Sequence, residues 1–188
     1  MLKRNNIFPI LVFAGIAALV VTIFANTAFA ADLRSRLAQN RVTEFTAFDG
    51  SCELVSEAET VVDDDAGVIY GRGEIYRGAL ISDNPMINGH SYIVLDYVED
   101  QESGDREIWV TSFFYPDAVD GAFILPGKGT LTADGPRVEH RGHGIGELDG
   151  LRIRATAHVP TEEPADLPCE PLFPPVQIDG VIIETPNR

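Results

Sequence analysis

Turn-forming clusters divide the second part of this chain into short segments, and no long helical pattern separates them. The clusters read "FDGS", "DDDAG", "SDNPMING", "EDQESGD", "ADGP" and "ELDG". The segments between them are rich in Val, Ile, Tyr, Phe, Trp and Thr, which are typical of strands. Only "ADLRSRLAQN" (31–40) has helical character. Because a parallel sheet needs crossover helices, the pattern predicts an all-β, antiparallel meander.

The expected strands are the segments between these turn clusters. They are Val42–Phe48, Cys52–Val62, Val68–Ile81, His90–Val98, Glu107–Tyr115, Gly129–Ala133, Arg137–Ile145, Leu151–Val159 and Val176–Ile183. Regular spacing with tight turns leads to an antiparallel β-barrel of about eight strands or to a sandwich.

Two Asp-Gly dipeptides indicate which face of each strand is inside. If Asp149-Gly150 forms a two-residue type I′ turn, Leu148 pairs with Leu151. Asp134-Gly135 is expected to form a turn of the same kind. Both registers gather small and apolar side chains on one face and charged ones on the other, whereas a slip of one residue would mix them.

One strand carries no large side chains on its predicted inner face over residues 142–146. Gly142, Gly144 and Gly146 alternate along it, opposite residues such as Ile153 and Ala155. Glycines permit sharp coiling of a sheet, which favours a closed barrel over a flat sandwich. They also leave room for a ligand or for large side chains from other strands.

The stretches "GRGEIYRGALISDNPMINGHSYIVLDY" and "GHGIGELDGLRIRATAHV" combine spaced glycines, an acidic turn and a late Gly-x-Gly-x-Leu-x-Gly-Leu-Arg hairpin. Together they resemble small exported bacterial β-barrels of the allene oxide cyclase-like, calycin-like kind, over about residues 68–159. The resemblance implies a barrel of eight or so strands with an apolar lumen. It carries over no catalytic residue, and a fold alone does not determine function.

The N-terminus has the features of an export signal. Two basic residues precede an apolar run over residues 7–25, and small residues at Ala28 and Ala30 suit a signal peptidase. We expect residues 1–30 to be removed and the protein to be periplasmic or extracellular. The alternative is an uncleaved segment that anchors the protein to the membrane through residues 7–25.

The remaining chain is strongly acidic. Removing residues 1–30 from 188 leaves 158, enough for one domain with its own core, with 12 basic against 29 acidic residues and a net charge of −17. Such a charge argues against nucleic acid or an anionic membrane as a partner. A small apolar ligand is the partner we expect, and the oligomeric state stays open.

Cys52 and Cys169 are the two cysteines of the chain. In an oxidising compartment a disulfide between them is expected, and loop entropy would make it worth about 4–5 kcal/mol. Two free thiols that await a metal or a substrate are the alternative. The predicted layout is a signal peptide at 1–30, a spacer at 31–40, the β-barrel at 41–160 and a proline-rich tail at 161–188 that is tied back by the disulfide and adds an edge strand.

Four side chains are candidates for lining a ligand pocket: His140, Trp109, Tyr97 and Phe113. The alternative for the aromatic residues is ordinary core packing. Residues three apart on a strand face opposite ways, so His140 is expected inside and His143 outside, and the two do not form a metal site. The chain has no nucleophile elbow, calcium loop, P-loop or dinucleotide fingerprint. The catalytic residues therefore stay unknown, and neither a metal nor a cofactor is predicted.

Three functions are compatible with these patterns. The first is binding of a small apolar molecule in the lumen of the barrel. The second is a cyclase or isomerase of allene oxide cyclase or dirigent type, which needs a few polar groups in the lumen. The third is a structural envelope protein without a pocket. The state of the interior, hollow or filled, separates the third from the first two.

Overall fold

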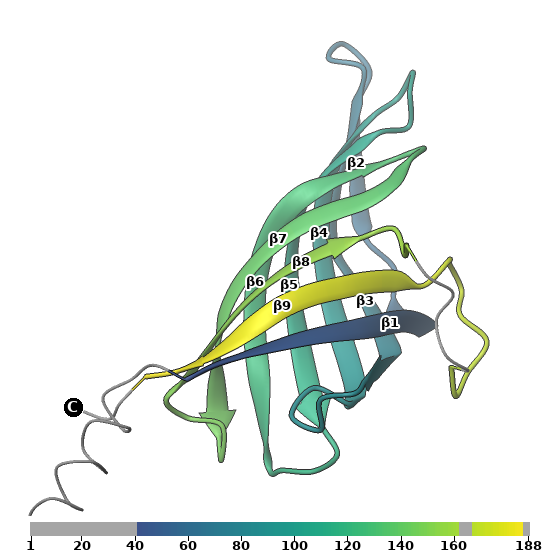
Figure 1. Cartoon of the computed structure of the whole chain (residues 1–188). Helices are drawn as coiled ribbons and strands as arrows, with labels where there is room; N and C mark the ends of the chain where they lie inside the picture. Colours follow the sequence, from purple (N-terminus) through teal and green to yellow (C-terminus); the bar gives the residue numbers. More distant parts are fainter. Residues whose placement is uncertain (1–40, 162–166, 186–188) are drawn as a thin grey trace, which may run out of the picture. The chain divides into compact units, whose positions relative to one another are not determined.

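The computed structural model of the protein describes residues 41–161 and 167–185, and the chain is all-β there, as predicted. The export signal and the spacer lie outside the described residues and stay predictions. The strands are β1 (Val42–Ser56), β2 (Glu59–Asp63), β3 (Val68–Ser82), β4 (Gly89–Asp100), β5 (Arg106–Pro116), β6 (Gly121–Thr132), β7 (Gly135–Gly146), β8 (Leu151–His158) and β9 (Val176–Glu184) (Figure 1).

The strands form one antiparallel sheet whose hydrogen bonding closes into a ring. Strands β3 to β9 pair with their neighbours in sequence, as in a meander. Strand β9 then pairs with β1, and β1 pairs with β3. Strand β2 pairs with the first residues of β3, so that β3 is shared between β1 and β2.

The expectation of an edge strand at Val176–Ile183 is wrong. Strand β9 lies between β8 and β1 and pairs with both. Ile178 and Ile182 are 3% and 2% exposed, so the strand buries its apolar face in the interior while both of its backbone edges are hydrogen-bonded. Residues 176–184 therefore belong to the sheet rather than to a separate tail.

Leu148 changes the expected β7–β8 turn. A two-residue loop at Asp149-Gly150 would pair Arg152 with Glu147. In the structure Arg152 pairs instead with His143, four residues earlier in the chain. A type I′ turn needs a positive φ at both central residues, and among the described residues only glycines have one. The longer loop lets Leu148 fold inward, where it is 2% exposed.

The β6–β7 turn is shifted as well, by two residues. Thr132 pairs with Gly135, so the loop is Ala133-Asp134 and Gly135 takes the positive φ of 100°. Both shifts are even, and side chains alternate along a strand, so the faces predicted for β6, β7 and β8 are kept. Of the glycines expected on the inner face, Gly146 is exposed at the end of β7 and has a φ of 69°.

The interior is packed along most of the ring and closed at one end. Phe114, Phe123 and Leu125 are among the largest fully buried side chains. At the closed end Ile87, from the β3–β4 loop, is completely buried beside this core, as is Leu148 from the β7–β8 loop.

The predicted disulfide joins Cys52 on β1 to Cys169, which precedes β9. Such a bond is compatible with an exported protein. Across the described ranges, 41–161 and 167–185, no helix has the length and apolar character that crossing a membrane requires.

Candidate functional site

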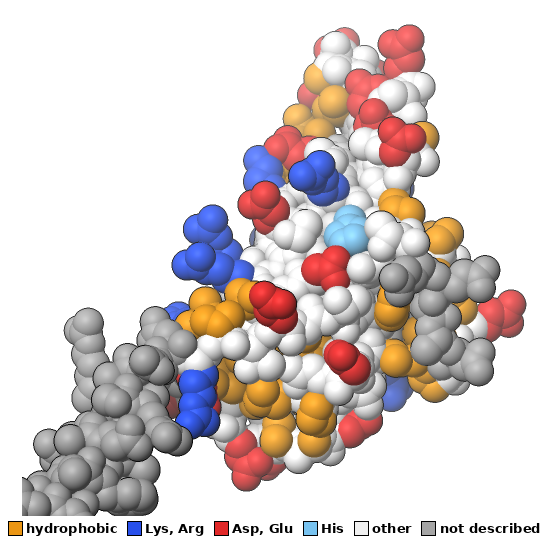
Figure 2. All heavy atoms as spheres, viewed as in Figure 1, with side chains coloured by type: hydrophobic (Ala, Val, Ile, Leu, Met, Phe, Trp, Pro, Cys, Tyr) orange, Lys and Arg blue, Asp and Glu red, His pale blue; other side chains and the backbone are white. Residues whose placement is uncertain are grey.

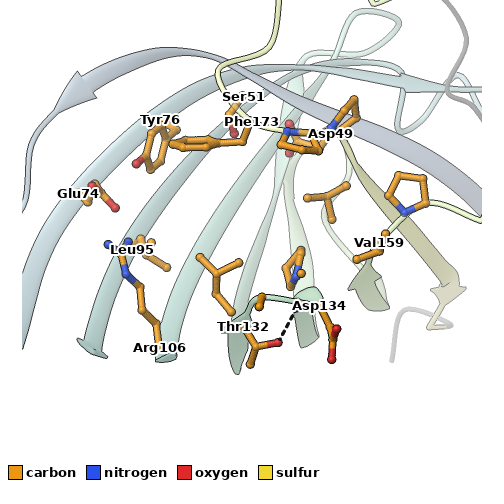
Figure 3. Close-up of a pocket in the computed structure, with 18 residues that line it drawn as sticks. Asp49, Ser51, Glu74, Tyr76, Leu95, Arg106, Thr132, Asp134, Val159 and Phe173 are labelled. Atoms are coloured by element: carbon orange, nitrogen blue, oxygen red, sulfur yellow. Dashed lines mark hydrogen bonds between the residues drawn. The ribbon is translucent and has the colours of Figure 1, made fainter. Parts of the chain in front are cut away.

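A cavity of about 520 Å³ lies at the end of the ring that carries the β6–β7 turn (Figure 3). Its described wall is mainly apolar and includes Leu95, Leu131, Val159, Phe173, Pro174 and Val176. Cavities of this size suit small-molecule ligands. The interior is therefore filled at one end and hollow at the other.

Asp49 is a buried carboxyl group in this wall. It continues the inward series Phe45, Ala47, Asp49 along β1 and is 4% exposed. Ser91 Oγ donates a hydrogen bond of 3.0 Å to Asp49 Oδ1, whereas Asp49 Oδ2 has no partner among the described residues. Burial raises the pKa of Asp49 to about 7, although the hydrogen bond from Ser91 lowers it. This carboxyl group therefore exists in both protonation states near neutral pH.

Glu74 and Arg106 bring further charge to the cavity, and Figure 3 shows them on the same side of it as Tyr76. Arg106 Nε donates to Glu99 Oε2 at 2.6 Å, and the Arg106 guanidinium carbon lies 4.3 Å from the centre of the Tyr97 ring. Glu74 Oε2 is buried and lacks a hydrogen-bond partner within the described part of the chain. The guanidinium is thus engaged by other residues, while Glu74 keeps an unsatisfied oxygen.

Tyr76 lies near Glu74 on β3 and stays protonated. Burial, followed by the nearby Glu74 carboxylate, raises the pKa of Tyr76 to about 12. Its ring contacts Phe173 edge-on, with the ring centres 5.6 Å apart and the planes at 81°.

The segment 167–175, which we call the strap, covers part of the cavity. Cys169 holds it to β1 through the disulfide, and the Leu172 N–H donates to Ser51 O at 2.7 Å. Beyond Leu172, the strap places Phe173, Pro174 and Pro175 in the cavity wall. Phe173 is also 55% exposed, so one side of its ring faces solvent and the other the cavity.

Two of the four predicted ligand residues lie inside the ring, although outside the described wall of the cavity. His140 and Tyr97 are 5% and 7% exposed. His140 Nδ1 lies 3.2 Å from Leu125 O and donates to it, and burial lowers the pKa of His140. His140 is therefore a neutral core residue, while His143 is exposed on the opposite face, as predicted.

Trp109 and Phe113 lie on the outer face, which corrects the prediction that they line a lumen. Strand β5 buries Ile108 and Phe114, and alternation turns the odd-numbered positions between them outward. Trp109 is 40% exposed, with Lys128 Nζ 4.9 Å from its ring centre. Both aromatic side chains therefore cover the outside of the sheet.

The polar residues of the cavity were missed in the sequence. Asp49 lies in "FDGS", which is typical of a turn but is the middle of β1. The signal that identifies it is alternation, because Phe45 and Ala47 place Asp49 on the apolar face. Glu74 follows the bulge of β3 at Gly73, which has a φ of 75°, and lines the cavity.

Acidic side chains gather on the projecting end of the molecule, beyond the cavity, as the face in Figure 2 shows. The tip of the β2–β3 hairpin there contains Asp63, Asp64 and Asp65, and the tip of the β4–β5 hairpin contains Asp100, Glu102 and Asp105. Within the described residues, no three His, Cys, Asp or Glu side chains are grouped as metal ligands would be.

Comparison with known proteins gave no match to a family model, to a curated protein or to a solved structure. The resemblance to allene oxide cyclase-like barrels therefore stays a prediction.

Proposed function

We propose that the protein binds a small, mainly apolar molecule inside a closed barrel formed by its ring of strands. The cavity of about 520 Å³ supports the proposal, because its wall is apolar apart from a few polar groups that would orient a ligand. The cavity also favours binding over the alternative of a structural envelope protein without a pocket.

Titration with the neutral fluorescent probe Nile red tests this function. Binding in the cavity raises the fluorescence of the probe, and Leu131→Trp, which fills the cavity, is expected to weaken binding at least about tenfold. Ile145→Trp adds the same kind of bulk at an exposed site on β7 and serves as the matched control. Equal binding by both variants, or no binding by the natural chain, would contradict the proposal.

A second candidate, an isomerase or cyclase, is favoured by Asp49. A carboxyl group with a pKa of about 7 can accept and return a proton near neutral pH, as general acid–base catalysis requires. The test is incorporation of deuterium from D₂O into an enolisable ketone held in the cavity. Exchange that is lost in Asp49→Asn supports catalysis. Exchange no faster than that of the ketone in D₂O without protein supports binding without catalysis.

A further inference from the structure

We infer that the cavity selects apolar molecules that carry a hydrogen-bond donor, above all an organic ammonium group, over apolar carboxylates. This inference rests on the proposed binding function and adds the chemical class of the ligand. The donor would reach either Asp49 or Glu74, which lie apart in the wall of the same cavity, with Tyr76 and Phe173 between them (Figure 3).

Two unsatisfied oxygens carry the inference. Asp49 Oδ2 and Glu74 Oε2 are each shielded from water and lack a hydrogen-bond partner within the described residues, and both side chains line the same cavity. A buried acceptor without a donor costs free energy in the empty protein. A ligand that supplies a donor to either oxygen removes that cost, whereas a purely apolar ligand does not.

The charge of the wall points the same way. Among the described residues that line the cavity, Arg106 is the one basic side chain, and its guanidinium already donates to Glu99 at 2.6 Å and stacks over Tyr97. Asp49 and Glu74 have no such cationic partner in the ion pairs of the described residues. A cation therefore finds complementary charge, whereas a carboxylate meets like charge.

The surroundings reinforce this selectivity. The whole chain has a net charge of −15, and the acidic hairpins on the projecting end beyond the cavity include Asp63–Asp65. Figure 2 shows acidic side chains on the projecting end. Such a field raises the local concentration of cations and lowers that of anions near the cavity.

Three probes of one shape, studied by isothermal titration calorimetry at pH 8, test the inference: 2-(1-naphthyl)ethylamine, 2-(1-naphthyl)ethanol and 1-naphthylacetate. The amine is expected to bind at least about tenfold more tightly than the carboxylate, with the alcohol between them. Asp49→Asn and Glu74→Gln are each expected to weaken amine binding about tenfold and to change alcohol binding less than about twofold. Asp117→Asn removes the same charge from an exposed loop at the closed end and is the matched control.

The outcomes separate the inference from the function on which it rests. Binding of the amine and the alcohol with equal affinity, tighter binding of the carboxylate, or an amine affinity that neither substitution changes overturns the inference and leaves ligand binding intact. If none of the three probes binds, the proposed function itself fails. Thermal melts of each variant establish that it is folded, and the comparison of probes on the natural chain decides the question without any variant.

Discussion

Ser91 Oγ donates a hydrogen bond to Asp49 Oδ1 across a strand that lies between them. Ser91 is on β4 and Asp49 is on β1, and β3 separates these two strands. The contact exists because β3 has Gly78 at this point. A Cβ atom at Gly78 would lie 2.6 Å from Asp49 Oδ1 and 2.7 Å from Ser91 Oγ. A glycine on the middle strand thus holds a buried acid and its donor together.

Gly78→Ala is therefore expected to destabilise the protein by about 1–3 kcal/mol, because the methyl group displaces a buried, hydrogen-bonded pair. Urea unfolding of the two chains measures the loss. Ser91→Ala, which removes the donor without adding atoms, separates the lost hydrogen bond from crowding. Unchanged stability of Gly78→Ala would mean that the pair is not held as described.

The raised pKa of Asp49 makes stability fall as pH rises. The unfolded chain loses this proton near pH 4 and the folded chain near pH 7, so the folded state binds more protons between these values. The raised pKa contributes up to about 4 kcal/mol to the free energy of unfolding. This contribution is fully present below pH 4 and is lost by pH 7. Asp49→Asn removes it.

The measurement is the difference in unfolding free energy between Asp49→Asn and the natural chain at several pH values. We expect the Asp49→Asn variant to gain stability relative to the natural chain from about pH 4 to about pH 7, and the difference to level off above that range. Asp117→Asn, at an exposed site, controls for the change in net charge. A difference that does not vary with pH would show that Asp49 titrates normally.

Local chemistry in the sequence was enough to predict an all-β antiparallel meander and the faces of β6, β7 and β8. The alternation around His140 and His143 was predicted correctly because both turns near them were displaced by an even number of residues. The exact registers were not predictable, since they depend on where Leu148 finds space in the interior. The pairing of β9 with β1 is a contact between distant segments, and no local pattern indicates it.

The candidate site was harder to predict than the fold. Trp109 and Phe113 were predicted to line a pocket because they are aromatic. The buried positions of β5 are the even-numbered ones, which include Phe114. Asp49 was hidden within turn-like residues, and Glu74 depends on the bulge at Gly73. Such a site is assembled from several strands, the β6–β7 turn and the strap, so its members share no sequence motif.

Replacing Cys52 and Cys169 together by Ser is expected to lower stability by about 4–5 kcal/mol, because the bond restricts a long loop of the unfolded chain. The two residues are separated by 117 positions. Urea unfolding in the presence and absence of dithiothreitol checks this. The natural chain in reductant should match the double variant, and a difference between them would reveal a second effect of the substitutions.

Phe173→Ala is expected to speed ligand release with little loss of stability. The side chain covers the cavity beside Tyr76 but is 55% exposed, so its truncation opens the wall and removes little core packing. Stopped-flow dilution of bound Nile red gives the rate, for which we expect an increase of about tenfold. Leu172→Ala, on the strap but outside the described wall, is the matched control, and equal release from both variants would contradict the covering role.

The position of β9 has a consequence for how the chain folds. Val42 pairs with Ile183 and Asp49 with Val176, so nearly the whole described chain lies between the two members of each pair. Contacts between such distant segments raise the contact order of the chain, and all-β proteins of high contact order fold slowly, on the scale of milliseconds to seconds. Until the last strand is in place, β1 and β8 each present an open edge of the kind that recruits another chain. The final strand therefore governs both how fast the protein folds and its tendency to aggregate before folding is complete.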